Sequence, residues 1–421
     1  MNQFSKNIAI IGSGIAGLGA AYLLHPHHHI TVYEKNDVIG GHARTKHIRY
    51  GDGDIAVDTG FIVFNHKNYP HLTALFKHLN VPTQKSVMSF GVMSEQDDLE
   101  WGAENINALF GQRRNLMRPK FYQFLIDVLK FNRSAIATTR SGDLTLGELI
   151  KKMGLGDWFE RYYILPMGGA IWSCSLQSML SFPARFFVDF FEAHGLLTVT
   201  NQPQWYTVTG GSILYLEKLT AGFRDKIKTS CGITKVLRQN GKVQITDTLG
   251  AGAEYDEVIF AGHADDTLSV LGDASESEKK TLGAFHYQKN MVVLHKYTGI
   301  MPKRRACWGS WVYHATPEAD NGPISVTYWM NHLQGIRQDC PVFVTLNPRV
   351  AIPEGDVFER HVFDHPIYDP VAVAAQPKIA ALQGRKSTWF CGAYHRNGFH
   401  EDGLASAVDI AARMGITPPW Q

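Results

Sequence analysis

Apolar residues near the start of the chain form short runs that polar or glycine-rich turns separate. Residues 7–11 are an apolar run of strand length, residues 18–24 have the composition of a helix, and residues 30–33 are rich in β-branched and aromatic side chains. The order predicts a strand, a helix and a second strand.

The turn between the first strand and the helix runs from Gly12 to Gly17 and reads Gly-Ser-Gly-Ile-Ala-Gly, and Glu34 ends the second strand, twenty residues after Gly14. In this context the motif is the dinucleotide-binding fingerprint. Gly12 makes the tight turn, Gly14 lets the backbone approach a pyrophosphate, and Gly17 allows close helix–strand packing. The helix N-terminus attracts phosphate. Glu34 can accept hydrogen bonds from both ribose hydroxyls and would repel a 2′-phosphate, which disfavours NADP. An ordinary strand–helix turn is the weaker alternative.

Helical spacing replaces this pattern between residues 61 and 204. Residues 69–79 predict a helix, and residues 86–93 alternate like a strand. Residues 121–131 predict a strongly apolar helix, and residues 162–173 are typical of a pocket wall. Residues 181–191 contain five phenylalanines, which suits a hydrophobic core and also a tunnel for a long apolar substrate.

Four basic residues, Arg113, Arg114, Arg118 and Lys120, precede the apolar helix at 121–131. A solvated basic segment leading into a core helix is the favoured interpretation. The alternative is a basic, aromatic surface that contacts an anionic membrane or forms an entry for a lipid substrate.

The second half of the chain is richer in strands. Residues 233–246 predict a hairpin with an Asn240-Gly241 turn. Further strands are predicted at 257–260, 291–295, 306–313, 324–330, 342–346 and 388–394, and helices at 213–219, 369–382 and from the turn at 397–403 to about 414. The strands between 291 and 346 predict one antiparallel sheet with an aromatic face that could form a wall over the site, made of Trp308, Trp311, Tyr313, Tyr328 and Trp329.

Composition narrows the class of protein. The 421 residues suffice for two domains, 44% hydrophobic residues indicate a globular chain, and a net charge of +2 gives no case for nucleic acid. Five widely spaced cysteines without Cys-x-x-Cys predict reduced thiols, and His27–His29 predict a solvated loop with no metal. No signal peptide or membrane span is expected. We expect a cytoplasmic protein, with peripheral contact at the inner face of a membrane left open.

Glu34 is followed by Gly40-Gly41-His42-Ala43-Arg44-Thr45 and then by Asp58-Thr59-Gly60-Phe61. With these stretches the chain resembles the FAD-dependent amine oxidase and carotenoid desaturase superfamily, over roughly residues 1–62, 205–265 and 388–415. Within it, Gly40–Thr45, Leu346-Asn347-Pro348, Phe390–Tyr394 and Gly398–Leu404 are similar to a bacterial group of predicted NAD/FAD-binding proteins and to flavin-dependent fatty-acyl desaturases. His42 stands where classical amine oxidases carry Arg, which counts against a plain amine oxidase.

The resemblance implies FAD and an α/β fold of two domains. One is a Rossmann-like FAD-binding domain of glutathione reductase type with a β-meander, from residues 1–62, 205–283 and 387–421. The other is a mixed α+β substrate domain from residues 63–204 and 284–386. The family contacts adenine through a backbone position best matched by Val236, and its last helix points its N-terminus at the flavin. Ala393 replaces an acid that is usual in the family. The implied cofactor-binding residues are Gly12, Ser13, Gly14, Ala16, Gly17, Glu34, Lys35, Gly41, His42, Arg44, Thr45, Thr59, Gly60, Phe61, Val236, Gly262, Gly392, Asp402, Gly403 and Leu404.

Lys289, Tyr394 and Glu401 are the catalytic candidates, although Glu401 also suits a helix start and Tyr394 a packing role. The expected activity is an FAD-dependent oxidoreductase that dehydrogenates a long apolar substrate, such as an unsaturated or methylated fatty-acyl chain. A flavin amine oxidase is the first alternative. A flavin-dependent fatty-acid double-bond isomerase, or an FAD-bearing partner of a lipid-modifying enzyme, is the second. The expected partner is an apolar small molecule or acyl lipid, and not nucleic acid.

Overall fold

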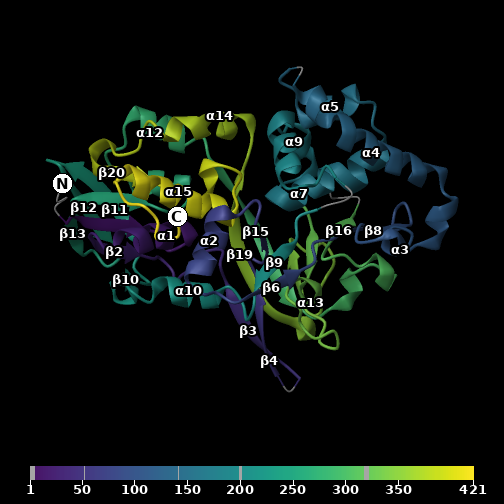
Figure 1. Ribbon diagram of the computed structural model, residues 1–421, viewed down its shortest axis with the longest axis horizontal. Coiled ribbons are helices and arrows are strands. Elements are labelled where there is room, and N and C mark those ends of the chain that lie inside the picture. The colour runs from purple at the N-terminus through teal and green to yellow at the C-terminus, as the bar shows by residue number, and fades with distance from the viewer. Residues whose placement is uncertain (1–4, 52, 141, 199–201, 317–321) are drawn as a thin grey trace.

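A parallel five-stranded sheet forms one end of the molecule in the computed structural model, which describes residues 5–51, 53–140, 142–198, 202–316 and 322–421 (Figure 1). The sheet has the order β10-β2-β1-β14-β20. Its strands are β1 (Asn7–Ile11), β2 (His29–Tyr33), β10 (Ile227–Lys228), β14 (Glu257–Phe260) and β20 (Thr388–Phe390), all paired in parallel. Three distant parts of the chain therefore meet in one sheet, because parallel neighbours need long crossover connections.

A three-stranded meander lies on this end of the molecule (Figure 1). It consists of β11 (Ile233–Gln239), β12 (Lys242–Asp247) and β13 (Gly252–Tyr255). Asn240 and Gly241, both with positive φ, form the predicted turn between β11 and β12. A parallel sheet with a meander, next to a mixed second sheet, confirms the predicted fold class.

The second sheet has seven strands in the order β19-β15-β18-β17-β16-β7-β8. Its strands are β19 (Val357–Ile367), β15 (His286–His295), β18 (Phe343–Leu346), β17 (Val326–Trp329), β16 (Trp311–Ala315), β7 (Phe90–Ser94) and β8 (Leu99–Gly102). The strands predicted between residues 291 and 346 form one antiparallel arrangement, β15-β18-β17-β16, as predicted. The sheet as a whole is mixed, because β7 arrives from the first half of the chain and pairs with β16 in parallel.

The predicted aromatic face is confirmed for three residues and wrong for two. Trp311, Tyr313 and Tyr328 lie on one face and pack in the core beneath the helices, whereas Trp308 and Trp329 belong to a separate cluster with Phe343. Trp329 follows Tyr328 directly in β17, so strand alternation turns it to the opposite face, and Trp308 precedes β16. The aromatic side chains therefore serve two cores and form no single wall.

Helices cover both sheets. Around the parallel sheet and its edges lie α1 (Ile15–Leu24), α2 (Pro70–His78), α10 (Ile213–Thr220), α11 (Ala264–Val270), α12 (Glu276–Leu282), α14 (Pro370–Ile379) and α15 (His400–Arg413). At the other end lie α3 (Ile106–Leu109), α4 (Pro119–Thr139), α5 (Leu146–Lys152), α6 (Asp157–Phe159), α7 (Leu165–Trp172), α8 (Leu176–Leu180) and α9 (Ala184–Ala193); α13 (Met330–Leu333) follows β17. Residues 162–172 are helical, from a π-helical turn at Glu160–Ile164 into α7, and Ser173 ends the helix with a left-handed backbone.

Some strands were divided incorrectly or not predicted from the sequence. The predicted strand at 86–93 is two strands, β6 (Thr83–Ser86) and β7, which belong to different sheets. The hairpin of β3 (Thr45–Tyr50) and β4 (Gly53–Asp58) and the edge strand β19 were not predicted. β19 mixes charged, histidine and apolar residues, and so lacks the apolar run of a central strand.

The predicted domain boundaries stay a prediction. β9 (Trp205–Val208) begins the second predicted FAD-binding segment, but it pairs with β5 (Phe64–Asn65) and β6 from the predicted substrate segment. Within the described ranges, no helix combines the length and the apolar character needed to cross a membrane. The five cysteines are all buried free thiols.

Candidate functional site

The glycine turn after β1 is built from very close backbone contacts. Gly12 has φ of +107°, and a Cβ there would lie 3.0 Å from the Ala261 carbonyl group on β14's C-terminal side. A Cβ on Gly17 would lie 1.9 Å from the Gly12 carbonyl oxygen. Side chains at these two positions would push α1 away from the sheet, so the turn requires glycine for the reasons predicted.

Gly14 differs from its neighbours. Its φ of −69° suits any residue, and a Cβ there would meet no protein atom within 4 Å. Gly14 is the N-cap of α1, and no side chain caps this helix. An open space therefore adjoins helix N–H groups that a phosphate would satisfy. This arrangement fits the diphosphate of a dinucleotide.

Glu34 is held at the end of β2 in a fixed orientation. Its Oε2 accepts hydrogen bonds from the backbone N (3.1 Å) and Oγ (2.5 Å) of Ser13, and its Oε1 accepts one from the backbone N of Asn36 (2.8 Å). Asn36 Nδ2 also donates to Oε1 at 2.9 Å, so each carboxylate oxygen already accepts two hydrogen bonds and a ribose hydroxyl would have to replace one of these donors. The acid is thereby tied to the glycine turn. The neighbouring Lys35 turns outward and pairs with Asp266 at 2.7 Å on the surface.

The Gly40–Gly41 turn lies directly against the first glycine turn. The backbone N of Gly40 donates to the carbonyl oxygen of Ser13 at 2.9 Å, and a Cβ on Gly41 would lie 3.2 Å from the Cα of Gly14. His42 follows and is half-buried, and its ring stacks on Phe363 at 4.5 Å. Its Nε2 atom is shielded from solvent and has no hydrogen-bond partner among the residues that the structure describes. A buried polar atom without a partner is costly, and a bound group could satisfy it.

Four histidines gather around this region. His365 lies 5.2 Å and His263 6.4 Å from His42, between ring centroids, and His400 stacks on Phe61 at 4.0 Å. Burial lowers the pKa of all four histidines. The pKa falls to about 4 for His365 and to about 3 for His400, and it is also lowered for His42 and His263. All four imidazoles are therefore neutral at pH 7.

Several side chains predicted at the cofactor are engaged with the protein instead. Arg44 forms a two-pronged ion pair with Glu359 of β19 (2.6 and 2.9 Å) and donates to Thr59 Oγ1. Thr45 Oγ1 donates to Asp58 (2.5 Å) and accepts from the backbone N of Ile213. These contacts join the Gly-Gly turn to β19 and to α10.

Backbone contacts place the next predicted residues. Phe61 N donates to the His42 carbonyl oxygen at 2.7 Å, and Gly60 sits so close that a Cβ would lie 2.1 Å from the same oxygen. Gly262 follows β14 with open space beside it, and the N of Gly392 donates to Ser406 Oγ at 2.9 Å. Ala16 is buried in the core beside α15.

The start of α15 uses both of its acids for helix capping. Glu401 accepts from the backbone N of His71 (2.8 Å) and Leu72 (2.9 Å), so it caps α2 and not its own helix. Asp402 turns back to the N of Phe399 at 2.9 Å. Because both Glu401 oxygens hold α2, the structure gives this catalytic candidate a structural role.

Gly403 and Leu404 pack α15 against α1. A Cβ on Gly403 would lie 2.8 Å from Ile15 Cγ2, and Leu404 is buried against Gly19. The two residues lie in the first turns of the helix and not in the turn before it. They bring the N-terminal end of α15 close to the start of α1.

The other two catalytic candidates lie in different surroundings. Lys289 is exposed, and its neighbour Asn290 is fully buried. Successive strand residues face opposite sides, so Asn290, and not Lys289, shares a face with His365, to which it donates at 3.2 Å. Tyr394 is buried and packs on Phe285, and its hydroxyl has no hydrogen-bond partner within the described part of the chain.

The carbonyl oxygen of Val236 accepts a hydrogen bond from Gly272 at 2.9 Å, and the contact of Val236 with an adenine stays a prediction. A segment a few residues earlier reaches Glu34. The N of Cys231 donates to the carbonyl oxygen of Glu34 at 2.8 Å, and that of Ser230 to Asn36.

Sequence reasoning missed the site residues that β19 supplies, chiefly Glu359, Phe363 and His365, and missed Asn290. No motif marks them, since they come from an irregularly patterned edge strand. The density of histidines between His361 and His400 was the available signal.

Comparisons with known proteins agree with this fold. The sequence profile of the NAD(P)-binding Rossmann-like domain matches residues 10–79. No curated relative matches the chain. The chain is similar in fold to a CLA-producing fatty acid isomerase from P. acnes, at 17% identity and a TM-score of 0.68, covering 97% of this chain and 98% of that one.

Two amine oxidases have a similar fold. Cyclohexylamine oxidase from Brevibacterium oxydans is 15% identical with a TM-score of 0.67, covering 98% of this chain and 100% of that one. A triple mutant of putrescine oxidase is 13% identical with a TM-score of 0.67, covering 97% and 99%. The three likenesses establish a shared two-part fold.

Proposed function

We propose that this protein is an FAD-dependent oxidoreductase that dehydrogenates a long apolar substrate such as a fatty-acyl chain. The glycine turn and the N-terminus of α1 would hold the diphosphate, and Glu34 the ribose. The open space at Gly14 and the unpartnered His42 Nε2 support this arrangement.

Bound FAD would supply the two-electron acceptor for a dehydrogenation, in which a double bond forms as a hydride and a proton leave neighbouring substrate carbons. The chain's own residues position the group and exclude solvent. The N-terminal end of α15, which Gly403 brings against α1, would stabilise negative charge on the flavin through the helix dipole. Asn290 fixes the orientation of His365 by donating to its Nδ1.

One observation carries the choice of an apolar substrate. A continuous set of aromatic contacts links the helical end of the molecule to the start of α15: Trp172 packs on Phe190 (4.9 Å), and Phe190 stacks on Phe399 (5.1 Å), the N-cap of α15. Trp172 Nε1 also donates to the carbonyl oxygen of Asn397. Aromatic packing therefore continues to the predicted flavin end.

The charges around this region disfavour an ammonium substrate. His42, His263, His365 and His400 are neutral, and Glu401 and Asp402 hold backbone N–H groups. An amine oxidase needs a group that recognises its amine. The two acids nearest the α15 end are committed to capping.

A fatty-acid double-bond isomerase is the second candidate. The observation in its favour is the similarity in fold, over nearly the whole chain, to the CLA-producing fatty acid isomerase. Both candidates take an acyl chain, and they differ in net electron transfer. The product distinguishes them, since dehydrogenation adds a double bond and isomerisation moves one.

Gly14→Ala is the sharpest test of the cofactor. The new methyl group fits the backbone and touches no protein atom, so the fold should be unchanged, whereas the methyl would occupy the space that a diphosphate needs. We expect FAD affinity to fall about tenfold or more. Gly53→Ala, where a Cβ also meets nothing, is the matched control. Equal FAD affinity in both variants would contradict the assignment.

The substrate is tested by anaerobic incubation of the FAD-loaded protein with unsaturated fatty acids, with phospholipids that carry them, and with a panel of amines. Loss of the visible flavin absorbance with an acyl lipid, and an added double bond in the product, is the expected result. Bleaching by an amine alone would overturn the apolar assignment. A moved double bond without a change in oxidation state would favour the isomerase.

A further inference from the structure

Exposed apolar side chains concentrate at the end of the molecule that is far from the parallel sheet. Among the described residues, six of the twelve large apolar side chains that are exposed lie within residues 106–129. They are Ile106, Leu116, Met117, Tyr122, Ile126 and Leu129. A concentration of this kind marks an interaction surface more often than chance exposure.

Helix α4 has two apolar faces. Phe121, Phe124 and Phe131 point into the aromatic core, as a buried face should. Tyr122, Ile126 and Leu129, spaced by four and three residues, form a second stripe on the opposite, exposed side. Figure 1 shows α4 at the outer edge of the molecule, away from the parallel sheet.

The 3-10 turn at Arg113–Met117 presents Leu116 and Met117 next to this stripe. Tyr122 donates its hydroxyl hydrogen to the carbonyl oxygen of Leu116 at 3.0 Å, which joins the turn to the helix. Buried Asn115 anchors the turn by donating to the carbonyl oxygen of Glu100 at 3.0 Å. The exposure of Leu116 and Met117 is therefore imposed by a well-anchored turn.

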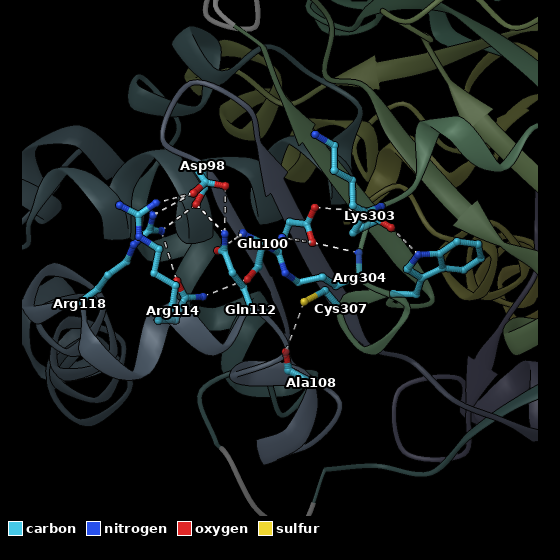
Figure 2. Close-up of polar contacts among 12 residues, drawn as sticks. Asp98, Glu100, Ala108, Gln112, Arg114, Arg118, Lys303, Arg304 and Cys307 are labelled. Carbon is cyan, nitrogen blue, oxygen red and sulfur yellow. Dashed lines mark hydrogen bonds and ion pairs between the residues drawn. The ribbon is translucent and has the colours of Figure 1, made fainter.

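Polar contacts behind the turn strengthen this anchor (Figure 2). Gln112 accepts from the backbone N of Glu100 (2.9 Å) and donates to the Asp98 carbonyl oxygen (2.9 Å). Asp98 pairs with Arg114 (2.7 Å) and Arg118 (3.5 Å). Glu100 in turn accepts from the backbone N of Lys303 and from Arg304.

Cations surround the apolar stripe. Residues 106–140 contain seven cations, Arg113, Arg114, Arg118, Lys120, Lys130, Arg133 and Arg140, against one acid, Asp127. Asp127 is buried and caps Gly156 N at 2.9 Å. Asp98 and Asp157 neutralise Arg114, Arg118 and Lys120. Lys130 and Arg133, next to Leu129, pair with no acid in the part of the chain that the structure describes.

We propose that this surface, made of Leu116, Met117, Tyr122, Ile126, Leu129, Lys130 and Arg133 and here called the α4 surface, rests on an anionic lipid bilayer. Apolar side chains flanked by lysine and arginine suit the boundary between acyl chains and negative head groups. Tyr122 has the apolar ring and polar tip typical of that depth. The surface stands on its own geometry and does not depend on the proposed chemistry.

Vesicle flotation of the FAD-loaded full chain tests the proposal. Two vesicle compositions are compared, phosphatidylcholine alone and phosphatidylcholine mixed with anionic phosphatidylglycerol. We expect binding to the anionic vesicles only, and weaker binding as salt screens the charges. Binding that is equal on neutral vesicles, or insensitive to salt, would overturn the anionic assignment.

Two double variants separate the contributions. Ile126→Ser with Leu129→Ser should weaken binding about tenfold or more, and Lys130→Glu with Arg133→Glu by at least as much. Leu249→Ser is the matched control, because Leu249 is 81% exposed, like Met117, but lies in the turn between β12 and β13. Wild-type binding in the first two variants, or a loss in Leu249→Ser, would contradict the proposal.

A second copy of the chain is the rival occupant. Light scattering without lipid distinguishes it: a wild-type dimer that becomes monomeric in Ile126→Ser with Leu129→Ser would show that the α4 surface binds itself. A wild type and double variant of equal mass, with vesicle binding lost only in the variant, supports the membrane.

Discussion

The two ends of the molecule are packed in different ways, one by close backbone contacts and the other by large side chains. At the parallel-sheet end, backbone segments pack so closely that single positions require glycine. A Cβ on Gly17, for example, would lie 1.9 Å from the Gly12 carbonyl oxygen. At the helical end, the volume of aromatic side chains fills the core, in clusters such as Trp172, Phe182, Phe187 and Phe191. The first kind of constraint leaves a motif in the sequence, whereas the second leaves only composition, because many arrangements of similar residues fill the same volume.

Phe187→Ala should have the largest effect on stability. Phe187 is fully buried, stacks on Phe191 at 4.2 Å and contacts Trp172. We expect the free energy of unfolding to fall by about 3–5 kcal/mol through lost burial and a cavity. Denaturant unfolding measures it. Phe186→Ala, at a half-buried neighbour, is the control and should lower the free energy of unfolding clearly less. An equal loss in both variants would show that the helical end is loosely packed.

Gly17→Ala tests the other end. Its Cβ would lie 1.9 Å from the Gly12 carbonyl oxygen, so α1 must move away from the sheet. The expected loss is about 3 kcal/mol of unfolding free energy, together with FAD binding. Gly14→Ala, by contrast, should lose FAD affinity without losing stability. A Gly17→Ala protein with normal stability would contradict the close packing of α1.

Glu401→Gln tests the joint between α15 and α2 through pH. Burial raises the pKa of Glu401 from its ordinary 4.5 to about 7. Between pH 4.5 and pH 7 the folded chain therefore binds a proton that the unfolded chain has lost, and the free energy of unfolding falls as the pH rises. The pKa values of Asp58 and Asp402, raised to about 6, act in the same direction.

The glutamine variant stays neutral at every pH. Its stability relative to wild type should therefore improve by about 1–2 kcal/mol between pH 5 and pH 8, on top of a constant cost for the lost acceptor. Denaturant unfolding at each pH measures this difference. Glu148→Gln, at an exposed helix cap where the pKa is lowered, should show no such improvement. A pH-independent difference for Glu401→Gln would exclude the buried carboxyl as its source.

These contrasts explain what the sequence could reveal. The glycine requirement at Gly12 and Gly17 was predictable, because close backbone contacts fix the residue type, and so was the place of Glu34 directly after β2. The ribose contact of Glu34 and the adenine contact of Val236 stay predictions. The capping of α2 by Glu401 was not predictable, because its partners, His71 and Leu72, lie 330 and 329 residues away. The histidines of β19 depend on tertiary pairing with β15, which no local pattern records.

Lys289→Met is expected to have the smallest effect, and it tests where the two ends meet. β15 crosses from the parallel-sheet end into the seven-stranded sheet, and its alternation sends Lys289 to solvent and Asn290 to His365. The visible spectrum of the FAD-loaded variant should match that of wild type, and the rate of flavin reduction by an acyl substrate should change less than about twofold, because an exposed lysine contributes little to a buried site. Asn290→Leu has a similar volume and should alter both the spectrum and the rate, since it frees His365. A shifted spectrum in Lys289→Met alone would reverse the assignment of the two faces of β15.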